Sequence, residues 1–97
     1  MSETPLRILG IPGSLRAASY NRALLCAAAE VLPPGVELDL FTLEDIPAYN
    51  DDVQSQGDPE AVAVLKQRLA GVDAVLIATP EYNYSIPGVL KNAIDWV

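Results

Sequence analysis

The apolar run from Val72 to Ala78, together with the polar stretch after it, constrains the fold of this chain most strongly. The run consists mainly of β-branched and aliphatic residues, which predicts a strand covered on both faces. Pro80 ends the strand because proline has no N–H to donate to a neighbouring strand. Pro87 suits the first turn of a new helix, with Ser85 or Ile86 near its N-cap. We therefore expect a strand, a loop and a helix in this order.

The loop between this strand and this helix carries two aromatic rings and several hydrogen-bonding groups. Its residues are Glu81, Tyr82, Asn83, Tyr84 and Ser85. Ligands of open α/β sheets bind outside the carboxyl ends of the strands, so the loop is a candidate wall of a ligand site. The alternative is a polar turn in which the two tyrosine rings pack on a neighbour.

A second unit of the same kind opens the chain. Leu6 to Ile11 is an apolar strand, and a polar loop follows it before a helix that begins near Ser19 or Asn21. The N-terminus of a helix presents unpaired N–H groups and a partial positive charge, which together stabilise a bound phosphate. Hydrogen-bond donors at Ser14, Ser19 and Asn21 and the guanidinium of Arg16 would add to this effect.

The first loop contains neither G-x-G-x-x-G nor G-x-x-x-x-G-K-[ST]. A dinucleotide site and an ATPase phosphate loop are therefore both disfavoured, while the phosphate of a mononucleotide remains. Taken alone, the loop has a simpler interpretation, in which Ser19 or Asn21 only caps the helix and Arg16 is a solvated charge. The presence of the second polar loop makes the phosphate site the favoured interpretation.

The segments between these two units complete an alternation of strands and helices. The first helix should run to about Leu32, with Cys26 as a small core residue. Val36 to Thr42 alternates apolar and polar residues, which is typical of an exposed edge strand. A further helix should begin after Asp58, its N-cap, and end at Gly71. The apolar residues expected to face the core from the helices are Ala23, Leu24, Ala27, Ala28, Val31, Val62, Leu65, Leu69, Val89, Leu90, Ala93, Ile94 and Val97.

The order β-α-β-α-β-α predicts a parallel sheet joined by right-handed crossovers. If the strands lie in the order two, one, three, the two polar loops leave the same end of the sheet. The segment from Leu43 to Gly57 is too long for a bare connection unless it has a role. Asp51 and Asp52 within it are interpreted as a solvated turn rather than as a metal site. Lys91 and Asp95 are interpreted as a surface pair on the last helix.

Composition excludes several classes of function. The chain has 97 residues, of which 51% are apolar, and this suits one small domain with a core. A formal net charge of −7, with six basic residues and no basic cluster, argues against a nucleic-acid or membrane surface. Because the chain has no histidine, Ser-His-Asp catalysis is excluded and a transition-metal site is disfavoured. Any chemistry is therefore expected to come from a cofactor. A single cysteine and the lack of a signal-peptide pattern predict a cytoplasmic protein.

Together the motifs resemble the NADPH-dependent FMN reductase family of flavodoxin-like proteins, which includes chromate and quinone reductases. The resemblance spans essentially the whole chain, in order and at the expected separations. It is carried by Gly13-Ser14-Leu15-Arg16 with Ser19 and Asn21, by Pro47, Tyr49 and Asp51, and by Pro80-Glu81-Tyr82-Asn83 with Ser85, Pro87-Gly88 and Leu90 to Trp96.

The resemblance implies an α/β fold: a flavodoxin-like, doubly wound parallel sheet in three αβα layers. Residues 1–97 would form a single FMN-binding domain that holds only the first β-α-β-α-β-α portion. The resemblance also implies that Ser14, Arg16, Ser19 and Asn21 hold the FMN phosphate, and that Pro80, Glu81, Tyr82, Asn83 and Ser85 hold the isoalloxazine edge.

The activity implied by the resemblance is hydride transfer from NAD(P)H to the flavin and onward to a small-molecule acceptor such as a quinone, free FMN or chromate. No side chain is then required as a catalytic acid or base, because the flavin performs the redox step. A homodimer or homotetramer is also implied. The alternatives are a flavodoxin-like electron carrier and a flavin-free chain that acts only through oligomerisation.

The family fold has about two more strands with their helices than the pattern in this chain. The third strand would then be a long apolar edge, which promotes aggregation unless another strand pairs with it. This chain would correspond to the amino-terminal half of the family fold. We therefore expect that it belongs to a longer protein, that the other half was lost, or that another chain completes the sheet.

Overall fold

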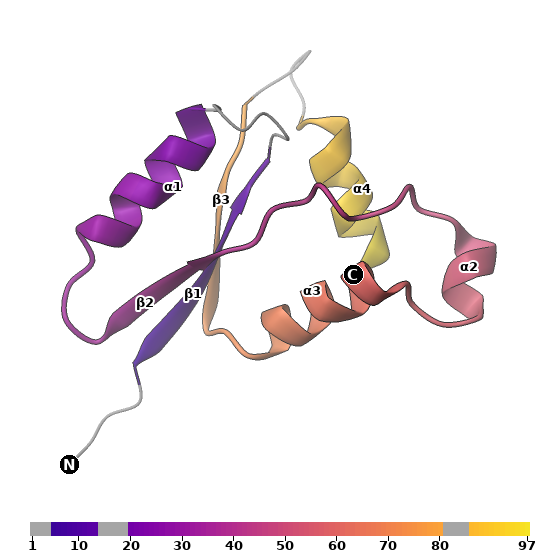
Figure 1. Cartoon of the computed structure of the whole chain (residues 1–97), viewed down its shortest axis with the longest axis horizontal. Helices are drawn as coiled ribbons and strands as arrows, with labels where there is room; N and C mark the ends of the chain where they lie inside the picture. Colours follow the sequence, from indigo (N-terminus) through magenta and orange to yellow (C-terminus); the bar gives the residue numbers. More distant parts are fainter. Residues whose placement is uncertain (1–4, 14–19, 81–85) are drawn as a thin grey trace.

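The computed structural model describes residues 5–13, 20–80 and 86–97, which form a three-stranded parallel sheet between helices. The strands are β1 (Leu6–Pro12), β2 (Val36–Leu40) and β3 (Ala74–Ala78), and the helices are α1 (Tyr20–Glu30), α2 (Asp51–Ser55), α3 (Glu60–Ala70) and α4 (Gly88–Trp96). Figure 1 shows α1 on one side of the sheet and α3 and α4 on the other. This arrangement confirms the expected α/β, flavodoxin-like fold class.

β1 is the central strand and pairs in parallel with both neighbours, in the sheet order β2-β1-β3. The edge position of β2 is as the sequence predicts, and the order is the one in which the two polar loops leave the same end of the sheet. Pro12 at the end of β1 aligns with Ala78 at the end of β3. The carboxyl ends of these two strands therefore lie side by side, and both polar loops leave the same end of the sheet, where the strands finish.

The core lies between the sheet and the layer formed by α3 and α4. Side chains alternate between the two faces of a strand, and this alternation directs Leu9 and Ile11 of β1 to the same side. Burying a leucine or isoleucine side chain stabilises a fold by roughly 1.5–3 kcal/mol. The buried cluster consists of Leu9, Ile11, Leu43, Leu65, Leu90 and Ala93. Val62 and Trp96 are also fully buried, and the inward-facing positions expected at Val62, Leu65, Leu90 and Ala93 are confirmed.

Helix α1 faces the sheet with a different side from the one expected. Leu25 is its buried residue, whereas Leu24 is 62% exposed and Val31, just after the helix, is 80% exposed. The expectation of a core cysteine is also wrong, because Cys26 is exposed. Ala23 and Ala27 are exposed and Ala28 is half-buried. The segment is apolar around most of its circumference, so periodicity alone did not define the side that packs on the sheet.

Two further expectations are corrected on the β3 side of the molecule. Val75, Leu76 and Ile77 are each more than 40% exposed, so β3 is not covered on both faces within this chain. Ile94 and Val97 of the α4 region are 47% and 53% exposed rather than buried. The reason is that β3 is the edge of the sheet, where the described residues supply no further strand. These side chains, except Leu76, help to line an apolar groove of about 110 Å³.

The helix starts also differ from expectation by about one residue. Pro59 is the N-cap of α3, and Asp58 instead forms a salt bridge with Lys66 at 2.8 Å. Pro87 is the N-cap of α4, a position expected at Ser85 or Ile86. A proline at the N-cap supplies no side-chain acceptor, so the first N–H groups of both helices lack a side-chain cap.

Leu69 of α3 was also expected to face inward. It is half-buried and packs against the core cluster.

We predict that α1 distinguishes its two adjacent leucines. Leu25→Ala should lower the free energy of unfolding by about 2–5 kcal/mol because it leaves a cavity under the helix. Leu24→Ala should change it by about 0.5 kcal/mol or less because the side chain is mostly solvated. Urea unfolding of the two variants measures the difference. Equal losses would place the packed side of α1 elsewhere.

We also predict that β3 is covered in any stable form of the protein. An apolar edge strand presents unpaired N–H and C=O groups that attract another strand, whereas Glu37 and Asp39 protect the opposite edge at β2. Hydrogen exchange of residues 74–78, combined with the mass in solution, tests this. A monodisperse monomer in which the outer amides of β3 exchange freely would contradict it.

Candidate functional site

The ends of β1 and β3 meet closely at Gly13 and Thr79. The Gly13 N–H donates to the Ala78 carbonyl oxygen at 2.8 Å, which extends the pairing of the two strands beyond Pro12. A Cβ atom on residue 13 would lie 2.5 Å from Thr79 Oγ1 and 2.7 Å from Thr79 Cβ. Both distances are too short for a side chain, so only glycine allows this approach without displacing the neighbouring segment. The two polar loops therefore begin in direct contact.

Asn21 and Pro80 are the predicted site residues that lie within the described part of the chain. Asn21 is in the first turn of α1, and Pro80 comes two residues after β3; both are half-buried. The first turn of α1 has no acidic residue, so no side chain of that turn offsets the partial positive charge of the helix N-terminus. The other predicted site residues, which lie outside the described residues, are Ser14, Arg16, Ser19, Glu81, Tyr82, Asn83 and Ser85.

The long segment after β2 is held against α4, and we call its residues 47–54 the strap. Asn92 donates from Nδ2 to the Pro47 carbonyl oxygen at 2.8 Å and accepts at Oδ1 from the Tyr49 N–H at 2.7 Å. Trp96 Nε1 donates to the same Pro47 oxygen at 2.8 Å. Gln54 Nε2 donates to the Trp96 carbonyl oxygen at 2.9 Å. These hydrogen bonds fasten the strap to α4, so the segment is more than a bare connection between β2 and α3.

Tyr49 ties the two ends of the strap together. Its ring meets the Trp96 ring edge-to-face, with centroids 4.9 Å apart. Its hydroxyl donates to Gln54 Oε1 at 2.9 Å, with Asp51 Oδ1 at 3.3 Å. Partial desolvation raises the pKa of the Tyr49 hydroxyl, and the Asp51 carboxylate raises this pKa further. The hydroxyl therefore keeps its proton and remains a donor at neutral pH.

The acidic pair in this segment begins a helix. Asp51 and Asp52 form the first turn of α2, and the Asn50 side chain caps that turn by accepting from the N–H groups of Asp52 and Val53. Acidic side chains are favourable there because they face the positive end of the helix. Both aspartates are exposed, as expected, but the interpretation of this segment as a turn is corrected to a short helix.

Sequence reasoning did not find the strap contact. The expected surface pair between Lys91 and Asp95 is present on α4, as a salt bridge. Asn92 and Trp96, which are also four residues apart, occupy the neighbouring side of the same helix. The available signal in the sequence was the pair of Asn92 and Trp96 on one side of the helix. An indole N–H that becomes buried needs an acceptor, and an amide one turn away can bond the same partner segment.

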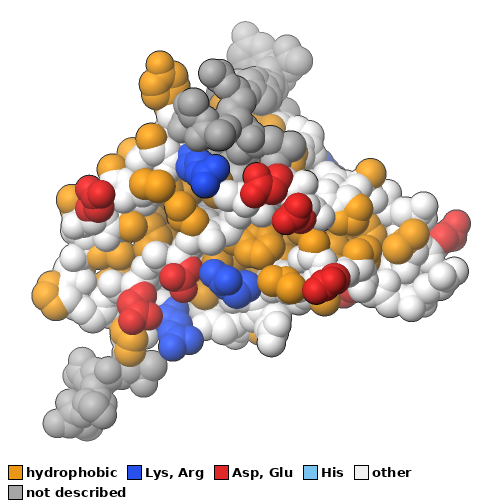
Figure 2. Space-filling model, in the orientation of Figure 1, with side chains coloured by type: hydrophobic (Ala, Val, Ile, Leu, Met, Phe, Trp, Pro, Cys, Tyr) orange, Lys and Arg blue, Asp and Glu red, His pale blue; other side chains and the backbone are white. Residues whose placement is uncertain are grey.

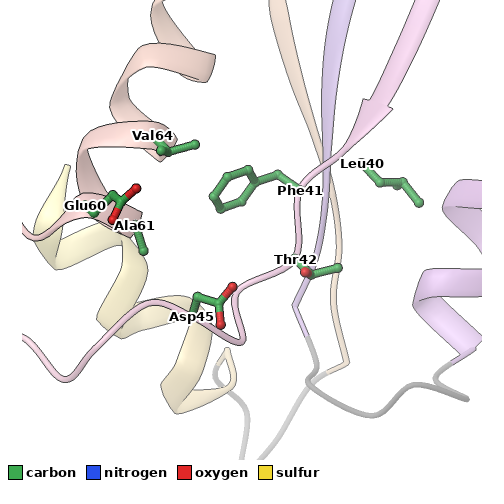
Figure 3. Close-up of a pocket in the computed structure, with 7 residues that line it drawn as sticks. All are labelled: Leu40, Phe41, Thr42, Asp45, Glu60, Ala61 and Val64. Carbon is green, nitrogen blue, oxygen red and sulfur yellow. The ribbon is translucent and has the colours of Figure 1, made fainter.

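A separate cavity of about 490 Å³ lies at the carboxyl end of β2 (Figure 3). The Phe41 ring points toward Val64, while the Leu40 side chain points the opposite way (Figure 3). The complete lining is Leu40, Phe41, Thr42, Asp45, Glu60, Ala61 and Val64. No predicted site residue belongs to this lining, and two carboxylates beside the cavity disfavour a phosphate there. The cavity is therefore distinct from the junction of β1 and β3.

The face drawn in Figure 2 has a mixed surface. Charged side chains of both signs are interspersed there with exposed apolar ones (Figure 2). Large apolar residues with high exposure include Leu6, Tyr20, Leu24 and Val31.

Within residues 5–13, 20–80 and 86–97, no helix has the length and apolar character needed to cross a membrane.

Comparison with known proteins relates the sequence to flavin enzymes. The family model described as NADPH-dependent FMN reductase matches residues 6–97. An NAD(P)H-dependent FMN reductase of Pseudomonas aeruginosa is 52% identical over 91 residues, which cover 94% of this chain and 49% of the relative. A quinone reductase of Escherichia coli is 43% identical over 99 residues, which cover 100% of this chain and 52% of the relative. The chain thus spans about half the length of these relatives.

Solved structures give the same relation. FerB from Paracoccus denitrificans, a flavoenzyme NAD(P)H:(acceptor) oxidoreductase, matches with a TM-score of 0.84 and 43% identity, over 94% of this chain and 50% of that protein. The azoreductase AzrA is 21% identical with a TM-score of 0.67, which supports the fold alone. Both the sequence match over residues 6–97 and the parallel sheet in the order β2-β1-β3 agree with the expected resemblance. The chain belongs to the NADPH-dependent FMN reductase family.

Proposed function

We propose that this chain is the FMN-holding part of an NAD(P)H-dependent oxidoreductase, with residues 1–97 as one flavin-binding unit. The observation that carries the proposal is the junction of β1 and β3, where Gly13 and Thr79 start both candidate flavin loops side by side. Ligands of doubly wound sheets bind outside the carboxyl ends of two neighbouring strands, at the point where the strand order reverses. Membership of the NADPH-dependent FMN reductase family supports the choice of ligand.

The described residues around the junction suit a flavin phosphate. Gly13 lets Thr79 pack directly against the end of β1, so the starting points of the two loops are held next to each other. Helix α1 begins seven residues later, and its first turn has no acid to repel an anion. Asn21 lies in that turn, where its side-chain amide can donate a hydrogen bond to a phosphate oxygen. These features agree with the chemistry of a monophosphate.

The remaining assignments rest on the family resemblance. In this proposal the phosphate is held by Ser14, Arg16, Ser19 and Asn21, and the isoalloxazine edge by Pro80, Glu81, Tyr82, Asn83 and Ser85. Arg16 contributes a planar cation that can bond two phosphate oxygens at once. The chain's tasks are to bind the flavin, orient it and keep one side open for the other reactants.

Bound FMN supplies hydride acceptance from NAD(P)H and electron delivery to a small-molecule acceptor such as a quinone, free FMN or chromate. The relatives, which are an FMN reductase, a quinone reductase and an NAD(P)H:(acceptor) oxidoreductase, support this class of acceptor. The absence of histidine from the sequence is compatible with chemistry that resides on a cofactor.

The proposed enzyme works in the cytoplasm as a homodimer or homotetramer. Support for assembly comes from the exposed apolar strand β3 and from Ile94 and Val97 beside it. Together they present apolar surface that association would remove from water, and such removal is the main favourable term in oligomer formation.

FMN binding tests the proposal directly. Added FMN should give the spectrum of a bound flavin, and Arg16→Ala should weaken its Kd about 10- to 100-fold because a charge-assisted bond is lost. Asn83→Ala should also weaken it. Arg68→Ala, an exposed cation on α3, is the matched control and should bind as the unchanged protein does. A folded protein that stays colourless in excess FMN would refute the proposal.

Turnover separates the enzyme from an electron carrier. With FMN bound, the protein should oxidise NADPH or NADH continuously when a quinone is present, and Arg16→Ala should reduce this rate at limiting FMN. An electron carrier would bind FMN but consume nicotinamide negligibly, so that result would favour the alternative.

The junction itself can be tested without flavin. Gly13→Ala should lower the free energy of unfolding by roughly 1–3 kcal/mol, because its Cβ would overlap Thr79. Gly71→Ala is the control, since its Cβ would meet its nearest neighbours at 3.7 Å, an ordinary contact. Chemical denaturation measures both. An unchanged stability for Gly13→Ala would mean that the strand ends are not packed as described.

A further inference from the structure

The contact between the strap and α4 imitates the pairing of two strands. The Asn92 amide bonds the C=O of Pro47 and the N–H of Tyr49, two backbone groups that a neighbouring strand would use. The Trp96 indole adds a second donor to the same carbonyl oxygen. Three bonds thus converge on one short stretch of backbone, and each has a length of 2.7–2.8 Å. The orientation of the Asn92 amide is set, because its donor faces a carbonyl and its acceptor faces an N–H.

The strap depends on these polar contacts because it buries little apolar surface. Helix α2 has no buried residue, and Val53 is 42% exposed. On the other side of the contact, Trp96 is only 1% exposed, so its N–H would lose its partner if the strap moved away. A buried donor without a partner is costly, and the strap and the end of α4 are therefore expected to move together.

Helix α4 connects this contact to the proposed flavin site. The helix begins just after the buried Pro87, where the second loop from Pro80 returns to the fold. Its side chains Leu90 and Ala93 enter the core, but Ile94 on its outer side is 47% exposed. The core holds one side of α4, and the strap holds the side that carries Asn92. The two together determine where α4 lies and hence where the second loop ends.

We propose that Asn92 and Trp96 are positioning residues that act through the strap to fix α4 and the end of the second loop. The consequence for flavin rests on the proposed function, whereas the coupling of strap and helix does not. Neither residue belongs to the set expected to touch FMN. Their effect is to hold the loop's attachment point in one place.

The single tryptophan of the chain reports the contact directly. Asn92→Asp replaces the amide donor with an oxygen that faces the Pro47 carbonyl, while it keeps an acceptor for the Tyr49 N–H. The emission of Trp96 should shift to the red, and acrylamide should quench it more strongly. Gln67→Glu on α3 is the control, because it makes the same chemical change at an exposed position. An unchanged emission in Asn92→Asp would overturn the proposal.

Hydrogen exchange distinguishes positioning from a general loss of stability. In Asn92→Asp, the amides of residues 48–54 and 88–91 should both exchange about tenfold faster or more, while those of β1 stay unchanged. Faster exchange in the strap alone would overturn the coupling to α4, and faster exchange everywhere would indicate a merely structural role. If Asn92→Asp does not fold, Gln54→Ala removes the bond to the Trp96 carbonyl and the bond from the Tyr49 hydroxyl, and it should give a smaller change in the same two segments.

FMN titration tests the consequence for the site. Asn92→Asp should raise the Kd for FMN on the order of tenfold, because a smaller fraction of the protein has the second loop correctly anchored. The visible circular dichroism of the bound flavin should also change. Wild-type affinity in a variant whose strap has come loose would overturn the proposal. If the unchanged protein binds no FMN, the proposed function fails, and the exchange pattern alone decides the positioning role.

Discussion

The parallel pairing of β1 with β3 is the contact on which the rest of the structure depends. Its register aligns Pro12 with Ala78 and continues in the hydrogen bond from the Gly13 N–H. A shift by one residue would turn each side chain of β1 to the opposite face and remove Leu9 and Ile11 from the core. The register that fills the core is therefore also the one that brings the two candidate flavin loops together.

The helix layer formed by α3 and α4 and the strap that lies against α4 are held by different forces. Helix α3 and the inner face of α4 are held by burial of apolar side chains, with Leu65, Leu90 and Ala93 in the cluster. The strap is held by hydrogen bonds to Asn92 and Trp96, and α2 within it buries no residue. Segments with few buried apolar contacts open at lower free energy than the core. The strap is thus a low-stability element that borders a high-stability one.

Much of the fold could be predicted from the sequence because strands and helices have different periods. The apolar runs, the breaks at Pro80 and Pro87, and the alternation of strands and helices predicted the order of the elements along the chain and a parallel sheet. The packed side of α1 was predicted wrongly, because a helix rich in alanine is apolar on nearly every side and only the sheet selects Leu25. Asn21 and Pro80 lie at the expected edge, while the roles of the other candidate site residues stay predictions.

The sequence by itself determined the element order, the parallel sheet and the family, since these depend on local pattern and on motifs that are continuous in the chain. Only the tertiary structure decided which residues far apart in the chain touch. The contact of Gly13 with Thr79 and that of Asn92 with Pro47 join segments 66 and 45 residues apart. No local periodicity encodes such contacts, because they arise only when the core has set the distance between whole elements.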